Sequence, residues 1–102
     1  MSLEFVYTPE LLEYMEQKKQ KNIVVEVVAC DHSDIEITEL YVHLLNERLT
    51  KFFKEEKHFR SVKTSVGEVL LPKYCLEYED IITFGLKKNW IFRSIDYKGI
   101  HL

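Results

Sequence analysis

The sequence has few of the residues on which several common kinds of site depend. Its 102 residues include three glycines and two prolines, which leaves no glycine-rich loop to hold phosphate groups. The two cysteines, Cys30 and Cys75, are too few for the disulfide framework of a small secreted domain. We therefore predict reduced thiols in a cytoplasmic protein. No Cys-x-x-Cys and no His-Glu-x-x-His motif is present, so the sequence does not predict a structural zinc site.

Excess positive charge and long apolar runs are missing as well. The formal net charge is -3, which removes the usual electrostatic reason to expect nucleic acid or an anionic membrane as a partner. No run approaches the ~18 apolar residues of a membrane-spanning helix. No basic segment precedes an apolar run, as it would in a signal peptide. We expect no nucleic-acid partner and no membrane partner.

The composition that remains is that of one globular domain. Hydrophobic residues make up 46% of the chain, charged residues 30% and aromatic residues 13%, a balance that argues against disorder. The length suits a single domain over residues 1–102. Six phenylalanines, six tyrosines and one tryptophan supply the bulk for its core.

An N-terminal helix is the clearest local prediction. Thr8 is a good N-cap, and Pro9 stands at the first helical position, where its missing N–H costs nothing. Leu11, Leu12 and Met15 follow at the spacing of one helical face. Residues 3–7 before the helix fit a short strand.

The rest of the chain is predicted to be mostly strand. The β-branched run 23–29 predicts a central strand, followed by an acidic turn over 29–34. Residues 38–46 fit a strand or a helical face, and we divide the segment into a strand over 35–44 and a middle helix over 46–57. A hairpin over 62–71 and strands over 80–86 and 90–97 follow, with a turn at 87–89. The prediction is an α+β domain of mostly antiparallel sheets with an N-terminal and a middle helix.

Cys30 and His32 form the sharpest candidate site. In an extended stretch, residues two apart project to the same side, so the thiol and the imidazole could share a ligand or a proton. A reactive thiolate needs a nearby cation, helix N-terminus or metal, and the acidic neighbours Asp31 and Asp34 oppose its formation. The competing interpretation is a small buried thiol beside a solvated acidic turn. We do not predict an enzyme, because the carboxylates of residues 77–80 are better explained as a solvated strand edge.

Several segments together resemble the HesB-like group, the fold of A-type iron–sulfur cluster carriers. They are the helix from Thr8, the strand running into Cys30, the segment 66–72 and the closing segments 80–86 and 92–100. The closer likeness is to a small branch with a Cys-Cys or Cys-selenocysteine motif. The second Cys of that motif and the family's C-terminal Cys-x-Cys are missing here. The resemblance implies a HesB-like domain and an iron–sulfur cluster or transition metal at Cys30, the one family ligand that carries over; His32 is a candidate metal ligand from its spacing to Cys30. A cluster usually takes four thiolates, so a homodimer would have to bridge it.

Two functional hypotheses follow. The first is a degenerate HesB-like protein that binds an iron–sulfur or thiol ligand through Cys30 as its sole candidate ligand, with His32 as helper; Cys75 is the other thiol of the chain and matches no ligand of the family. Stoichiometric iron and sulfide that Cys30→Ser removes would support it, and a metal-free protein would refute it. The second is an interaction or dimerisation module in which Cys30 is packed. Its candidate contact residues are Phe52 and Phe53 of the middle helix and Trp90 and Phe92 of an edge strand.

Overall fold

The chain folds into two helices and seven strands. The computed structural model describes residues 3–32, 35–73, 76–89 and 92–102, and the side chains of 29–32, 35–38, 89 and 92 lie outside the description. The elements are β1 (Glu4–Tyr7), α1 (Pro9–Lys18), β2 (Asn22–His32), β3 (Ile35–Leu45), α2 (Glu47–Glu55), β4 (Arg60–Lys63), β5 (Glu68–Leu71), β6 (Glu77–Asn89) and β7 (Phe92–His101). Their order confirms the predicted α+β class and the predicted places of both helices.

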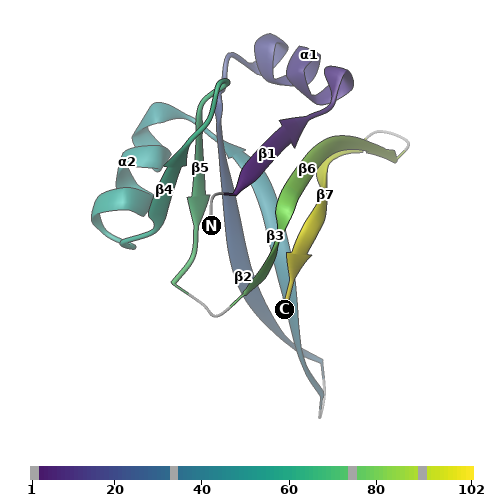
Figure 1. The fold of residues 1–102 in the computed structure, drawn as a ribbon. Helices are drawn as coiled ribbons and strands as arrows, with labels where there is room; N and C mark the ends of the chain where they lie inside the picture. Colours follow the sequence, from purple (N-terminus) through teal and green to yellow (C-terminus); the bar gives the residue numbers. More distant parts are fainter. Residues whose placement is uncertain (1–2, 33–34, 74–75, 90–91) are drawn as a thin grey trace.

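The strands form two mixed sheets (Figure 1). The first has the order β1-β6-β7 and the second the order β3-β2-β5-β4. The pairs β2–β3, β4–β5 and β6–β7 are antiparallel, as predicted for hairpins, whereas β1–β6 and β2–β5 are parallel. Strand β3 is therefore at one edge of the four-stranded sheet, and strand β7 is at one edge of the three-stranded sheet.

The hydrophobic residues fill two layers, one on each face of the four-stranded sheet. Because successive side chains of a strand face opposite ways, Ile23 and Val25 join the larger cluster, which also contains Phe84 of β6 and Leu11 of α1. Val24 lies between them in sequence and joins the second cluster, with Leu45, Leu70 and Phe53 of α2. The four-stranded sheet is thus covered by the other sheet and α1 on one face and by α2 on the other.

Local side-chain caps begin both helices, and a left-handed residue ends α1. The Thr8 hydroxyl accepts a hydrogen bond from the Leu11 N–H at 3.3 Å, and the Asn46 side chain accepts one from the Leu49 N–H at 2.8 Å. Lys19 is the C-cap of helix α1. It has a φ of 54° and donates its N–H to the Glu16 carbonyl. The Thr8 N–H in turn donates to the Phe84 carbonyl at 3.0 Å, which ties the start of α1 to β6.

Two predicted turns are wrong in their extent. The acidic turn predicted over 29–34 is strand as far as His32, because Cys30 pairs with Ile37 and His32 with Ile35. Residues 33 and 34 lie outside the description. The turn predicted at 87–89 is also strand, because Lys88 pairs with Arg93. In both places cross-strand pairing outweighs the turn-like composition of the local sequence.

Candidate functional site: the groove between β3 and β7

The predicted metal and thiol residues fall largely outside what the structure describes. Cys30 and His32 lie on the β2 backbone, and their side chains are not described; Cys75 and Trp90 are not described at all, and the side chain of Phe92 is not described. Within the described ranges there is no group of three or more His, Cys, Asp or Glu residues that could hold a metal ion. A ligand at Cys30 stays a prediction.

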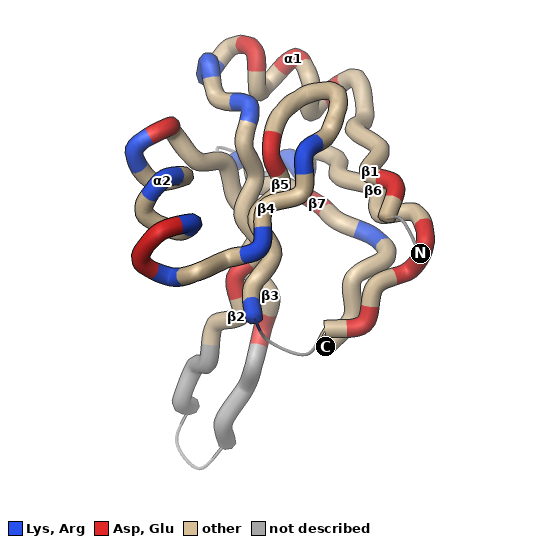
Figure 2. Tube along the Cα trace, turned by 60° about the vertical axis from the view of Figure 1, so that its left-hand side comes forward, with Lys and Arg blue, Asp and Glu red and all other residues tan. Residues whose placement is uncertain are grey.

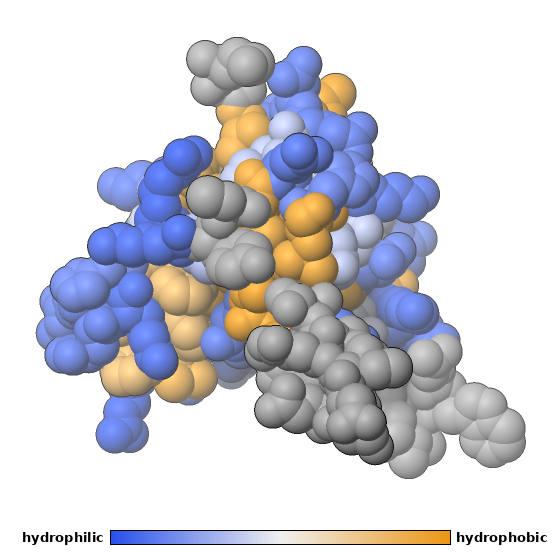
Figure 3. All heavy atoms as spheres, turned by 90° about the horizontal axis from the view of Figure 1, so that it is seen from below, coloured by the Kyte–Doolittle hydropathy of each residue, from blue (hydrophilic) through white to orange (hydrophobic). Residues whose placement is uncertain are grey.

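The two predicted interface residues of α2 differ from each other. Phe52 is 44% exposed, whereas Phe53 is buried and packs edge-on against Phe59 with ring centroids 5.0 Å apart. Pale hydrophobic surface lies on the α2 side of the molecule when it is seen from below (Figure 3). Charged residues of both signs follow one another along the helix (Figure 2). The surface of α2 therefore offers one exposed aromatic ring among mixed charges.

The predicted edge strand, β7, borders a groove. Strand β7 is the edge of its sheet, and it approaches β3, the edge of the other sheet. Between them lies a groove of about 440 Å³, which the end of α1 borders. The residues that line it come from three places in the sequence: Tyr14, Lys18, Gln20, Tyr41, Val42, His43, Leu44, Arg93, Ser94 and Ile95.

One wall of the groove is the outer edge of β3. On its other side β3 pairs with β2 along its whole length, from Asn22↔Leu45 to His32↔Ile35. Within the described ranges no strand pairs with the outer side of β3. Every residue other than proline carries a backbone donor and an acceptor, and an edge strand directs a row of these groups outward. Residues 41–44 therefore present peptide groups that can pair with another strand.

Two cations share one aromatic ring at the end of the groove nearest to α1. The Lys18 ammonium lies 5.7 Å from the centre of the Tyr14 ring, and the Arg93 guanidinium lies 6.0 Å from it. The face of an aromatic ring carries negative electrostatic potential, which holds cations near it. Within the described residues neither cation forms an ion pair.

A second cluster lies where the groove meets the outer face of the sheet. The Tyr41 and His43 rings are tilted, with centroids 4.4 Å apart, and His43 Nε2 lies 2.5 Å from Glu26 Oε2. His43 Nδ1 faces the Leu44 carbonyl at 3.3 Å. The carbonyl can only accept a hydrogen bond, so Nδ1 is the donor there. Tyr41 is 55% exposed, so the cluster presents an aromatic side chain that the protein fixes in place but does not bury.

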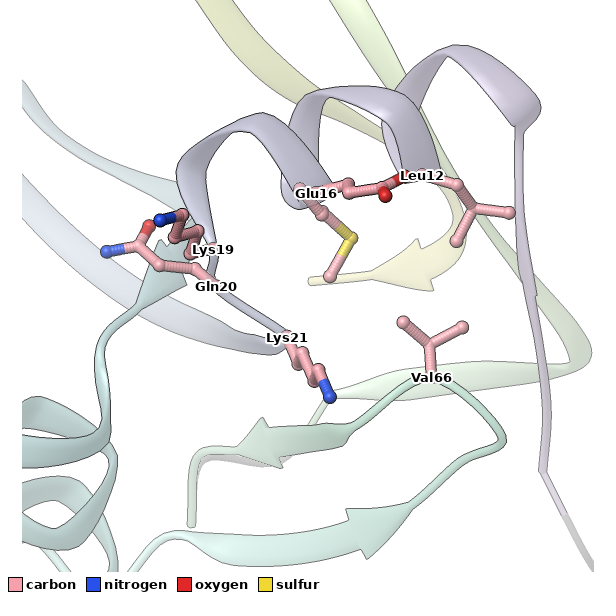
Figure 4. A pocket seen from close by; sticks show the side chains of 7 residues that line it. Leu12, Glu16, Lys19, Gln20, Lys21 and Val66 are labelled. Carbon is pink, nitrogen blue, oxygen red and sulfur yellow. The ribbon is translucent and has the colours of Figure 1, made fainter.

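Another hollow lies below α1, at the start of β2 (Figure 4). It has a volume of about 430 Å³, and Leu12 and Val66 approach it from α1 and from the turn between β4 and β5. Its rim carries Glu16 beside Lys19 and Lys21, so both signs of charge are present and all three side chains are exposed. Nothing in this hollow defines the chemistry of a ligand.

Comparison with protein-family models, with curated proteins and with solved structures finds no match to this chain. The HesB-like resemblance therefore stays a prediction. Neither helix of the described part is long and apolar enough to cross a membrane.

Sequence reasoning missed the groove, although it predicted an edge strand at 90–97. Lys18 stands on the polar face of a helix, and Arg93 follows the start of a strand. Neither position carries a local sequence pattern that indicates a binding site, because the groove forms only where the topology brings β3 and β7 together.

Proposed function

We propose that this protein is an interaction module that binds an extended segment of a partner protein in the groove between β3 and β7. One observation carries the proposal. The outer edge of β3 at residues 41–44 lines a groove whose far wall is residues 93–95 of β7. A segment lying there would add a strand to β3, and main-chain hydrogen bonds would supply affinity while the groove walls read its side chains.

The groove has the composition and the rigid support that such a surface needs. Tyrosine and arginine dominate the residues that matter most in interfaces, and Tyr14, Tyr41 and Arg93 line this groove. Val42 and Ile95, one from each wall, also belong to the larger core cluster. Because the walls are anchored in a packed core, the groove needs little ordering before it binds, which lowers the cost of association.

The surface of α2 is the rival, and the groove is better supported. Phe52 stands among charged residues and is flanked in sequence by Lys51 and the buried Phe53. Helix α2 satisfies its own backbone, so it has no equivalent of the outward peptide groups of β3. A partner there would depend on one ring, whereas the groove combines backbone pairing with several aromatic and cationic side chains.

The test is a selection of random peptides on the intact protein, followed by mapping of the selected peptides. The perturbed backbone amides, followed by NMR, are expected to lie at residues 41–44 and 93–95. Tyr41→Ala should weaken binding by about tenfold or more, because truncation of a central interface tyrosine commonly costs 1–2 kcal/mol or more.

The matched control is Phe52→Ala, which removes an aromatic ring of similar exposure, 44% against 55%. It should leave the affinity within about twofold, as most residues outside an interface centre do. Selected peptides that map to α2 and lose affinity in Phe52→Ala would overturn the proposal. So would a selection that enriches no peptide.

A further inference from the structure

We infer that the segment bound in this groove is acidic, an inference that rests on the function proposed above. It follows from the charges that line the groove and from the way in which the structure holds them. The occupant is a partner chain with aspartate or glutamate side chains in an extended stretch.

The first support is the sign of the charge. The whole chain is acidic, with 17 Asp and Glu residues against 14 Lys and Arg and a formal net charge of -3. The described residues that line the groove nevertheless include Lys18 and Arg93 and no carboxylate, and His43, which also lines it, is paired with Glu26 and adds no net charge. Glu26 contacts His43 from the outer face of the sheet but does not line the groove. A basic groove on an acidic protein attracts the opposite charge and repels a basic segment.

The second support is that Lys18 and Arg93 both lie near the Tyr14 ring and that neither has an acidic partner among the described residues. Lys18 and Arg93 lie within 6.0 Å of the centre of the same Tyr14 ring. The negative potential of the ring face attracts each cation but does not neutralise its charge. Lys54, by comparison, has Glu68 at 3.0 Å. A carboxylate bound at Arg93 would supply a counter-charge, because a guanidinium can bind a carboxylate through two parallel hydrogen bonds.

The third support is that the unpaired edge of β3 and the two cations border the same groove. Arg93 belongs to the β7 wall, and Lys18 belongs to the end of α1 above it, while residues 41–44 form the opposite wall. A strand that pairs with β3 would carry its side chains past the two cations. Backbone pairing selects an extended segment of almost any sequence, and the cations then select acidic ones, because the charge pairs set specificity more than they set raw affinity.

The experiment uses the random-peptide selection with two double variants of the intact protein. Lys18→Glu with Arg93→Glu reverses the charge of the groove, and both side chains are exposed, so the fold should survive. Lys51→Glu with Lys57→Glu is the control, since it makes the same change in net charge at exposed residues on and after α2. Circular dichroism and the unfolding midpoint of each variant establish that it is folded.

We expect the selected peptides to be enriched in aspartate and glutamate. The groove variant should bind them at least about tenfold more weakly, which corresponds to about 1.4 kcal/mol, and the control should stay within about twofold of the native protein. Raising the salt concentration should weaken the native complex. Each of the Lys18→Gln and Arg93→Gln single variants should show an intermediate loss.

The outcomes separate this inference from the proposed function. Peptides that map to residues 41–44 without acidic enrichment, and that bind the groove variant as well as the native protein, would overturn the acidic partner and leave strand addition standing. Peptides that bind elsewhere would overturn both. A second copy of this chain in the groove, detected as a dimer that Tyr41→Ala dissociates while no peptide binds, would also overturn both.

Discussion

The two sheets meet along two lines, and the contrast between them separates stability from function. On one line, which we call the closed edge, the Tyr7 hydroxyl of β1 contacts the Thr64 hydroxyl at 3.1 Å. On the other, which we call the open edge, β3 and β7 border the groove. Both lines join the β1-β6-β7 sheet to the β3-β2-β5-β4 sheet, but among the described residues Lys18 and Arg93 of the open edge have no acidic partner.

Thr64 shows how completely the closed edge is satisfied. Its hydroxyl donates to the Gly67 carbonyl at 2.8 Å and accepts from the N–H groups of Val66 and Gly67 at 3.2 and 3.1 Å. Since its proton is used for Gly67, the Tyr7 hydroxyl must be the donor in their contact. At the open edge, Lys18 and Arg93 lie near an aromatic ring and have no carboxylate partner among the residues that the structure describes. An edge whose polar groups are paired within the protein stabilises the fold. An edge whose charged groups are unpaired can bind another molecule.

Breaking the closed edge at Gly67 should have the largest effect on stability. A Cβ at this position would lie 2.1 Å from the Lys21 carbonyl oxygen and 2.7 Å from its carbon. Because these are backbone atoms at the start of β2, the clash cannot be relieved by turning a side chain. Gly67→Ala should lower the free energy of unfolding by about 2–3 kcal/mol, measured by urea denaturation.

Gly85→Ala is the matched control for this substitution. A Cβ at Gly85 would meet Thr8 Cγ2 at 3.4 Å, an ordinary van der Waals contact, so its effect should stay within about 0.5 kcal/mol. Equal losses in the two variants would show that the turn at residues 64–67 does not form the close contact described here.

The overall order of helices and strands could largely be predicted from sequence, whereas the two lines along which the sheets meet could not. The caps at Thr8 and Asn46 act on neighbouring residues, so the helices begin where the local sequence indicates. The turns predicted at 29–34 and 87–89 fail for the opposite reason. Residues such as Asp31 and Lys88 favour turns locally, but their partners Glu36 and Arg93 lie on the facing strand, and that pairing depends on the register of the whole hairpin.

The candidate site depends on longer-range geometry still. Lys18, Tyr41 and Arg93 border one groove although they are separated by most of the sequence. Single-residue patterns place Lys18 on the polar face of a helix and residues 90–97 on an edge strand; the structure confirms the exposed position of Lys18 and, for residues 92–97, the strand. What they lack is the order of the strands, which decides that the edge of β7 faces the edge of β3.

Removing the hydroxyl of Tyr7 should have a smaller effect than the Gly67 clash. Tyr7→Phe keeps the ring, which lies 6.0 Å from that of Phe84, and deletes only the bond to Thr64. A hydrogen bond of this kind contributes about 1 kcal/mol, and Thr64 retains its three other contacts. Urea denaturation should show that loss, while the affinity for selected peptides stays unchanged because the groove is on the other line. Weaker peptide binding in folded Tyr7→Phe would mean that the two edges are not independent.

The smallest effect on stability is expected from a comparison of two lysines. Lys54 has an acidic partner, and Lys18 has none among the described residues. Lys54 donates to Glu68 at 3.0 Å and lowers the pKa of this carboxyl, and Ser61 acts in the same direction while burial opposes it. Because the folded state holds the proton less tightly than the unfolded state, the stabilisation is present above the ordinary pKa of about 4.5 and is lost as the pH falls through the lowered value.

Lys54→Met should therefore flatten the loss of stability between about pH 5 and pH 3, with an effect of about 0.5 kcal/mol or less for a partly exposed pair. Lys18→Met, which removes a cation without an acidic partner among the described residues, should leave that pH dependence unchanged. Unfolding midpoints across this pH range measure both. If Lys18→Met flattened the curve as Lys54→Met does, Lys18 would already have a carboxylate partner within the chain, and the groove would not need one from outside.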